Sequence, residues 1–127
     1  MTMAASDPKS RELIQTVSQI SNGLMAEVAQ VIIGKQENLR RVTIGILSNA
    51  NMLIEDFPGL AKTLMANTFA SSLGCKFKRV QFTPDLLPAD IMGTYMYDQQ
   101  AGEFKLRPGP LFTNVLLADE INRAPPK

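Results

Sequence analysis

The 127-residue chain contains no histidine and no tryptophan, and Cys75 is its only cysteine. A disulfide within the chain is therefore excluded, as is chemistry that needs histidine as an acid, a base or a zinc ligand. Aromatic residues make up only 6% of the sequence, which leaves few platforms for stacked bases. The 13 basic and 12 acidic residues give a net charge of +1, so bulk charge does not favour a nucleic-acid surface.

The sequence also has no long apolar run. Residues 1–11 are mostly polar, and no stretch approaches the roughly 20 apolar residues that a membrane-spanning helix needs. We therefore expect no membrane span, and a reduced, cytoplasmic setting fits a chain with a single cysteine.

A length of 127 residues allows one domain at most, and apolar spacing predicts that it contains both helices and strands, an α/β chain. The apolar residues recur at helical spacing over 10–30, 35–48 and 61–73, with Leu64, Met65 and Phe69 expected to face inward in the last helix. Short buried strands are expected at 52–55, 77–82 and 115–119, the last buried on both faces. Residues 95–107 predict a β-hairpin closed by a five-residue loop, after a short turn at 89–92.

The first chemical motif joins the strand at 52–55 to the helix that follows it. The phosphate-loop pattern is Gly, four residues, then Gly-Lys-Ser/Thr, and here it runs from Asp56 to Lys62 and Thr63. Backbone N–H groups at a helix start hold phosphate, the lysine reaches the β- and γ-phosphates, and the hydroxyl binds Mg²⁺. An ordinary strand–turn–helix connection is the alternative for this segment taken alone.

Two positions depart from that pattern. Ala61 replaces the second glycine and adds only a methyl group, whereas Asp56 replaces the first glycine and brings a carboxylate towards an anion-binding loop. Asp tolerates left-handed backbone better than most residues, so the loop can still form.

The second motif is a pair of carboxylates after the apolar strand at 115–119. Asp119 is placed to hold Mg²⁺, and Glu120 is placed to orient and deprotonate an attacking water. The alternative is an ordinary acidic strand end that faces solvent. Because the carboxylate pair occurs together with an upstream phosphate loop, a nucleotide–magnesium site is favoured.

With these residues in view, the chain resembles the N-terminal part of a MoxR-type AAA+ ATPase. The segments that carry the resemblance span most of residues 31–127: VIIGKQ (31–36), EDFPGLAKT (55–63), QFTPDLLPADIMG (81–93), RPGPLF (107–112) and LADEINRAPPK (117–127). The resemblance implies a P-loop NTPase core of three layers around a parallel sheet, incomplete in this chain, with an inserted β-hairpin. It divides the chain into an N-terminal tail and helix (1–30) and a partial ATPase core (31–127).

The resemblance also implies roles for individual residues. Within the core, the Walker A loop would occupy 56–63, the hairpin insert about 95–107, and the Walker B strand 115–120. Lys62 and Glu120 would be catalytic, and Thr63 and Asp119 would hold Mg²⁺. The residues expected to bind ATP are Ile32, Ile33, Gly34, Pro58, Gly59, Leu60, Ala61, Lys62, Thr63 and Leu64.

Family members act as homo-oligomeric rings, usually hexamers. They use ATP turnover to remodel or activate partner proteins, often with a von Willebrand factor A domain protein. The resemblance also implies a longer polypeptide, with a further central strand, an arginine finger and a helical lid. We therefore expect this chain to bind nucleotide at best, with turnover belonging to the full-length protein.

Two alternatives remain open at this point. One is a nucleotide-sensing or scaffolding module without turnover, which Asp56 favours. The other is a GTPase, although the sequence contains no Asn-Lys-x-Asp motif for reading guanine. The hairpin aromatics Tyr95, Tyr97 and Phe104 are expected to pack onto the domain, with contact to a partner protein as the alternative.

Overall fold

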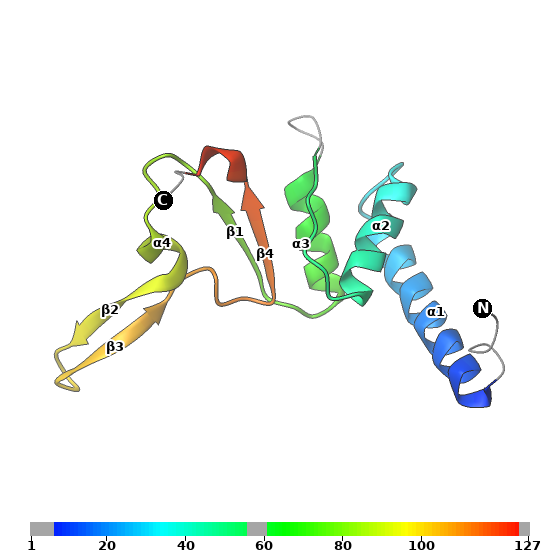
Figure 1. Cartoon of the computed structure of the whole chain (residues 1–127), viewed down its shortest axis with the longest axis horizontal. Helices are drawn as coiled ribbons and strands as arrows, with labels where there is room; N and C mark the ends of the chain where they lie inside the picture. Colours follow the sequence, from blue (N-terminus) through cyan, green and yellow to red (C-terminus); the bar gives the residue numbers. More distant parts are fainter. Residues whose placement is uncertain (1–6, 56–60, 125–127) are drawn as a thin grey trace. The chain divides into compact units, whose positions relative to one another are not determined.

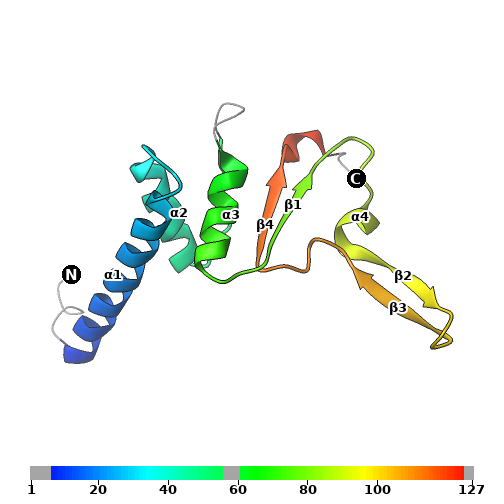
Figure 2. The ribbon, with the colours of Figure 1, turned by 180° about the vertical axis from the view of Figure 1, so that it is seen from behind.

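The computed structural model describes residues 7–55 and 61–124, which divide into two compact units, Met1–Leu73 and Gly74–Lys127. The first unit contains helices and the second contains the strands and two short helical turns (Figures 1 and 2). In the parts of the chain that the structure describes, no helix combines the length and apolar character that crossing a bilayer requires.

The first unit is built from three helices, α1 (Pro8–Ala29), α2 (Gln36–Leu47) and α3 (Lys62–Ser72). All three match predicted helices within about two residues, and Pro8 opens α1 at a position where its missing N–H costs nothing. Their core is one apolar cluster, to which Val42, Ile46 and Ile54 add partly buried side chains. Its buried members are Leu24, Val28, Ile32, Leu39, Met65 and Phe69.

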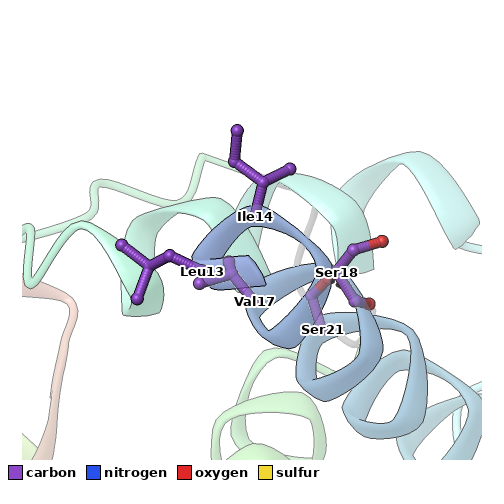
Figure 3. A pocket seen from close by; sticks show the side chains of 5 residues that line it. All are labelled: Leu13, Ile14, Val17, Ser18 and Ser21. Atoms are coloured by element: carbon purple, nitrogen blue, oxygen red, sulfur yellow. Dashed lines mark hydrogen bonds between the residues drawn. The ribbon is translucent and has the colours of Figure 1, made fainter. Parts of the chain in front are cut away.

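The predicted inward face of α1 is only partly buried. Leu24 and Val28 enter the core, but Leu13, Ile14 and Val17 remain exposed. Figure 3 shows these three side chains with Ser18 and Ser21 around a shallow hollow lined by α1 alone. The C-terminal part of α1 therefore anchors the helix.

The expected buried strand at 52–55 is wrong. Residues 51–55 have no strand structure, and the Met52 and Leu53 side chains are 44% and 78% exposed. A strand is stabilised by ladder hydrogen bonds to a neighbour, and in the described residues no segment pairs with 51–55. Ile54 packs against the helical core, and the partly exposed Met52 side chain lies over Gly45 of α2.

The second unit holds a parallel strand pair and an antiparallel hairpin. β1 (Phe77–Gln81) pairs in parallel with β4 (Val115–Asp119), so that Gln81 lies opposite Asp119. This confirms both predicted strands, but β4 is half-buried along its whole length and not buried on both faces. The reason is that β1 is its one strand partner among the described residues.

The hairpin is formed by β2 (Gly93–Asp98) and β3 (Glu103–Pro108), preceded by the short helix α4 (Pro88–Met92). Tyr97 faces Phe104 across the strands, with ring centroids 5.2 Å apart in an edge-on arrangement. Tyr95, Tyr97 and Phe104 are 67%, 55% and 69% exposed, so the expectation that they pack onto the domain is wrong. The Tyr97 and Phe104 rings contact each other across the hairpin, and all three aromatic side chains leave most of their surface in solvent.

Candidate nucleotide and magnesium site

The predicted phosphate-binding residues stand at the start of α3. Lys62 and Thr63 are its first two residues, both half-buried, and the first backbone bond of the helix runs from the N–H of Met65 to the carbonyl of Ala61, at 2.8 Å. The first N–H groups of a helix have no partner inside the helix, and its dipole adds partial positive charge there. This end of α3 is therefore suited to an anion. Buried Met65 and Phe69 fix the helix in the core.

Ala61 precedes α3 in a left-handed conformation, with φ 61° and ψ 24°. A phosphate-loop glycine is expected at this position, and the backbone angle explains why, since an L-residue pays about 1–2 kcal/mol for such a conformation. Ala61 is thus a more demanding replacement than its single methyl group suggested. Asp56, Pro58, Gly59 and Leu60 lie outside the described residues.

Residues 32–34, which are predicted to bind ATP, show three different environments. Ile32 is only 6% exposed and belongs to the helical core, whereas Ile33 is 87% exposed. Gly34 has φ +82°, which lets the chain turn between α1 and α2. Leu64, also predicted to bind nucleotide, is 46% exposed on α3, so its expected inward position is wrong. The roles of these four residues in binding stay predictions.

The two predicted carboxylates lie at the end of β4. Asp119 is the last residue of the strand, and Glu120 follows in a left-handed conformation, with φ 55° and ψ 38°, at the start of the 3-10 helix Ile121–Arg123. Non-glycine residues held in this region cost about 1–3 kcal/mol, and such strain is concentrated at functional sites. The turn at Glu120 ends the strand immediately after Asp119.

Two residues of β1 that the sequence analysis missed hold these carboxylates. Arg79 donates from Nε and Nη2 to the same oxygen of Asp119, Oδ2, at 3.1 and 2.7 Å. Gln81 donates from Nε2 to Glu120 Oε2 at 3.2 Å, and Arg123 Nη1 lies 3.1 Å from that oxygen. Arg79 and Gln81 lie on the same face of β1 because side chains alternate along a strand. This alternation is the one feature of the sequence that could have indicated that the two residues act together.

Each unit carries an oxygen donor of the kind that a magnesium ion takes. Mg²⁺ prefers oxygen and is usually held by one or two carboxylates together with substrate phosphates and water. The hydroxyl of Thr63 and the carboxylate of Asp119 are donors of this kind. In residues 7–55 and 61–124, no three His, Cys, Asp or Glu residues cluster into a self-sufficient metal site. Taken singly, the Thr63 hydroxyl and the Asp119 carboxylate are each chemically suited to Mg²⁺.

Comparison with known proteins identifies the family. The model of the ATPase family associated with various cellular activities (AAA) matches residues 51–127. The chaperone MoxR1 of Mycobacterium tuberculosis is 50% identical over 101 residues, which cover 80% of this chain and 27% of that protein. The chain belongs to the MoxR-type AAA+ ATPases. A protein named MoxR from Methylorubrum extorquens is 30% identical over 106 residues, covering 80% of this chain and 31% of that protein.

A solved structure supports the AAA+ fold of the chain. The crystal structure of a candidate ATPase from Cytophaga hutchinsonii matches with a TM-score of 0.75 and 40% identity. The match covers 94% of this chain and 37% of the other. The chain spans 27% and 31% of the length of the two curated relatives named above.

Proposed function

We propose that the chain carries the ATP and Mg²⁺ site of a MoxR-type ATPase that remodels or activates partner proteins. The observation that supports this most is the position of each motif in its own unit. Lys62 and Thr63 open a helix, and Asp119 and Glu120 end a strand of a parallel pair. These are the positions at which an α/β nucleotide site gathers its polar groups.

In this proposal each residue has one task. The N–H groups at the start of α3 and the Lys62 ammonium bind the phosphates of ATP, while Thr63 and Asp119 supply oxygens to Mg²⁺. Glu120 orients the attacking water and accepts its proton. When bound, the metal supplies positive charge that offsets the charge developing on the phosphoryl oxygens. The ATP-binding set further includes Ile32, Ile33, Gly34, Pro58, Gly59, Leu60, Ala61 and Leu64.

The wider setting is proposed from family membership. The protein would work in the cytoplasm as a homo-oligomeric ring of six subunits. A von Willebrand factor A domain protein would be its partner. The name of the Mycobacterium relative, a chaperone, supports the remodelling role. Turnover would draw on an arginine from the neighbouring subunit, which contributes about 10³–10⁵ in rate in related nucleotide hydrolases.

The second candidate is a nucleotide-sensing module without turnover. It is supported by the ion pairs in the structure, in which Arg79 holds Asp119 and Arg123 holds Glu120. Glu120→Gln separates the two functions. For an ATPase, we expect nucleotide binding at best by the 127-residue chain, and hydrolysis by a polypeptide extended to the length of the MoxR relatives, in which the variants are compared. Glu120→Gln should then retain ATP binding and lose hydrolysis, whereas the matched variant Glu103→Gln, in the exposed hairpin, should change neither. Equal behaviour of wild type and Glu120→Gln would contradict turnover.

A further inference from the structure

The end of the β1–β4 pair carries four charged side chains that neutralise one another. Arg79 pairs with Asp119, and Arg123 pairs with Glu120. The two acidic and two basic groups sum to zero charge. A divalent cation is attracted most strongly by carboxylates that are not paired with a positive group. Here both carboxylates are paired, so their attraction for a cation is reduced.

Arg79 makes the tighter of the two contacts. Its Nε and Nη2 atoms both donate to Asp119 Oδ2, and the shorter bond is 2.7 Å. The Asp119 side chain is 21% exposed, which reduces screening by solvent. Hydrogen bonds between ionised groups at this distance are about twice as strong as neutral ones. The guanidinium therefore holds an oxygen that a metal ion would need.

We propose that Arg79 competes with the divalent cation for Asp119. This inference rests on the proposed function, which assigns Asp119 to Mg²⁺. Without metal, the guanidinium holds the carboxylate. A cation that binds Asp119 must displace Arg79 or share the oxygen with a positive group about 3 Å away, and both lower metal affinity. Arg79 thus sets the threshold at which the carboxylate engages metal, and with it the dependence of the site on metal and nucleotide concentration.

The fold does not depend on this contact. Arg79 is 43% exposed, and β1 is fixed by its ladder to β4 and by Val80, which is 7% exposed. Replacement of Arg79 by glutamine should leave the strand pair intact, so a change in metal affinity would report on the carboxylate. Lys78 provides a matched control, because alternation along β1 places it on the opposite face from Arg79.

The test titrates Mn²⁺, a spectroscopic stand-in for Mg²⁺, into the 127-residue chain with equimolar ADP. Protein-bound Mn²⁺ is followed by electron paramagnetic resonance against a protein-free Mn²⁺–ADP reference. Arg79→Gln should bind Mn²⁺ about 3- to 10-fold more tightly than wild type, as expected for loss of a partly exposed but short ion pair. Lys78→Gln removes the same charge and should stay within twofold. Arg79→Lys keeps the positive charge and should also stay near wild type.

Asp119→Asn separates this inference from the proposed function. It should weaken Mn²⁺ binding. If Asp119→Asn weakens binding while Arg79→Gln binds no more tightly than wild type, the metal role of Asp119 stands and the competition is refuted. If Asp119→Asn leaves binding unchanged, the metal assignment itself fails and the competition fails with it. Equal tightening by Lys78→Gln and Arg79→Gln would reduce the effect to net charge and would also refute the inference.

Discussion

Gly93 lies at the base of the hairpin, where β2 leaves α4 and meets the end of β3. Its backbone angles, φ 95° and ψ 178°, fall in a region that only glycine occupies comfortably. A Cβ atom at this position would overlap the carbonyl oxygen of Arg107 and lie 2.5 Å from the amide nitrogen of Gly109. Both neighbours are backbone atoms, so neither can move aside as a flexible side chain would.

Gly93→Ala should therefore destabilise the second unit strongly. The backbone conformation costs alanine about 1–3 kcal/mol, and the steric overlap adds about 1–3 kcal/mol. The total of about 2–6 kcal/mol is a large share of the 5–15 kcal/mol that stabilises a typical domain. With an m-value of about 2 kcal/mol/M, the urea midpoint should fall by about 1–3 M.

Tyrosine fluorescence is the assay suited to this prediction. The chain has two tyrosines and no tryptophan, and both tyrosines, Tyr95 and Tyr97, lie on β2. Gly102→Ala is the matched control, because Gly102 also has positive φ, +68°, but a Cβ atom there meets nothing within 4 Å. It should cost only about 1–2 kcal/mol. A midpoint for Gly93→Ala equal to that of Gly102→Ala would refute the steric argument.

Two further predictions concern the acid sensitivity of the hairpin and the core around α3. The Lys105 ammonium, with the N–H groups of Ala101 and Gln100, holds the pKa of Asp98 below its usual value of 3.8. The contribution of Asp98 to hairpin stability is thus complete above about pH 4 and is lost as pH falls through the lowered pKa. An NMR titration of the Asp98 carboxyl measures this pKa, and a midpoint at or above 3.8 would contradict the prediction. Phe69, 2% exposed, should cost about 3–5 kcal/mol of unfolding free energy when replaced by alanine. Leu73→Ala, at a position 38% exposed, should cost under about 1 kcal/mol in the same chemical denaturation, and equal losses would contradict the described core.

Much of the secondary structure could be predicted because it depends on local patterns. The inward face of α3 was predicted less well. Leu64 and Met65 were both expected inside, but successive residues on a helix point about 100° apart, and the structure buries Met65 with Phe69 and Ala70 instead. The strand at 52–55 failed for another reason. Its apolar composition is suited to a sheet, but a strand also needs a neighbour that the segment itself does not specify.

The candidate site shows the same division between local and long-range information. Lys62 at a helix start and Asp119 at a strand end could be predicted, since each follows from the pattern on either side of it. The contact of Arg79 with Asp119 could not, because it depends on the register of two strands 40 residues apart in the chain. The left-handed backbone of Ala61 could be inferred only from the glycine that the phosphate-loop pattern has at this position, because alanine itself does not favour that conformation.

The central claim is that the start of α3 binds the phosphates of ATP. Isothermal titration calorimetry of the 127-residue chain with ATP and Mg²⁺ tests it most directly, alongside Lys62→Ala and the control Lys78→Ala on β1. The proposal predicts binding by wild type and Lys78→Ala that Lys62→Ala abolishes. Equal binding by all three proteins, or binding by none, would contradict it.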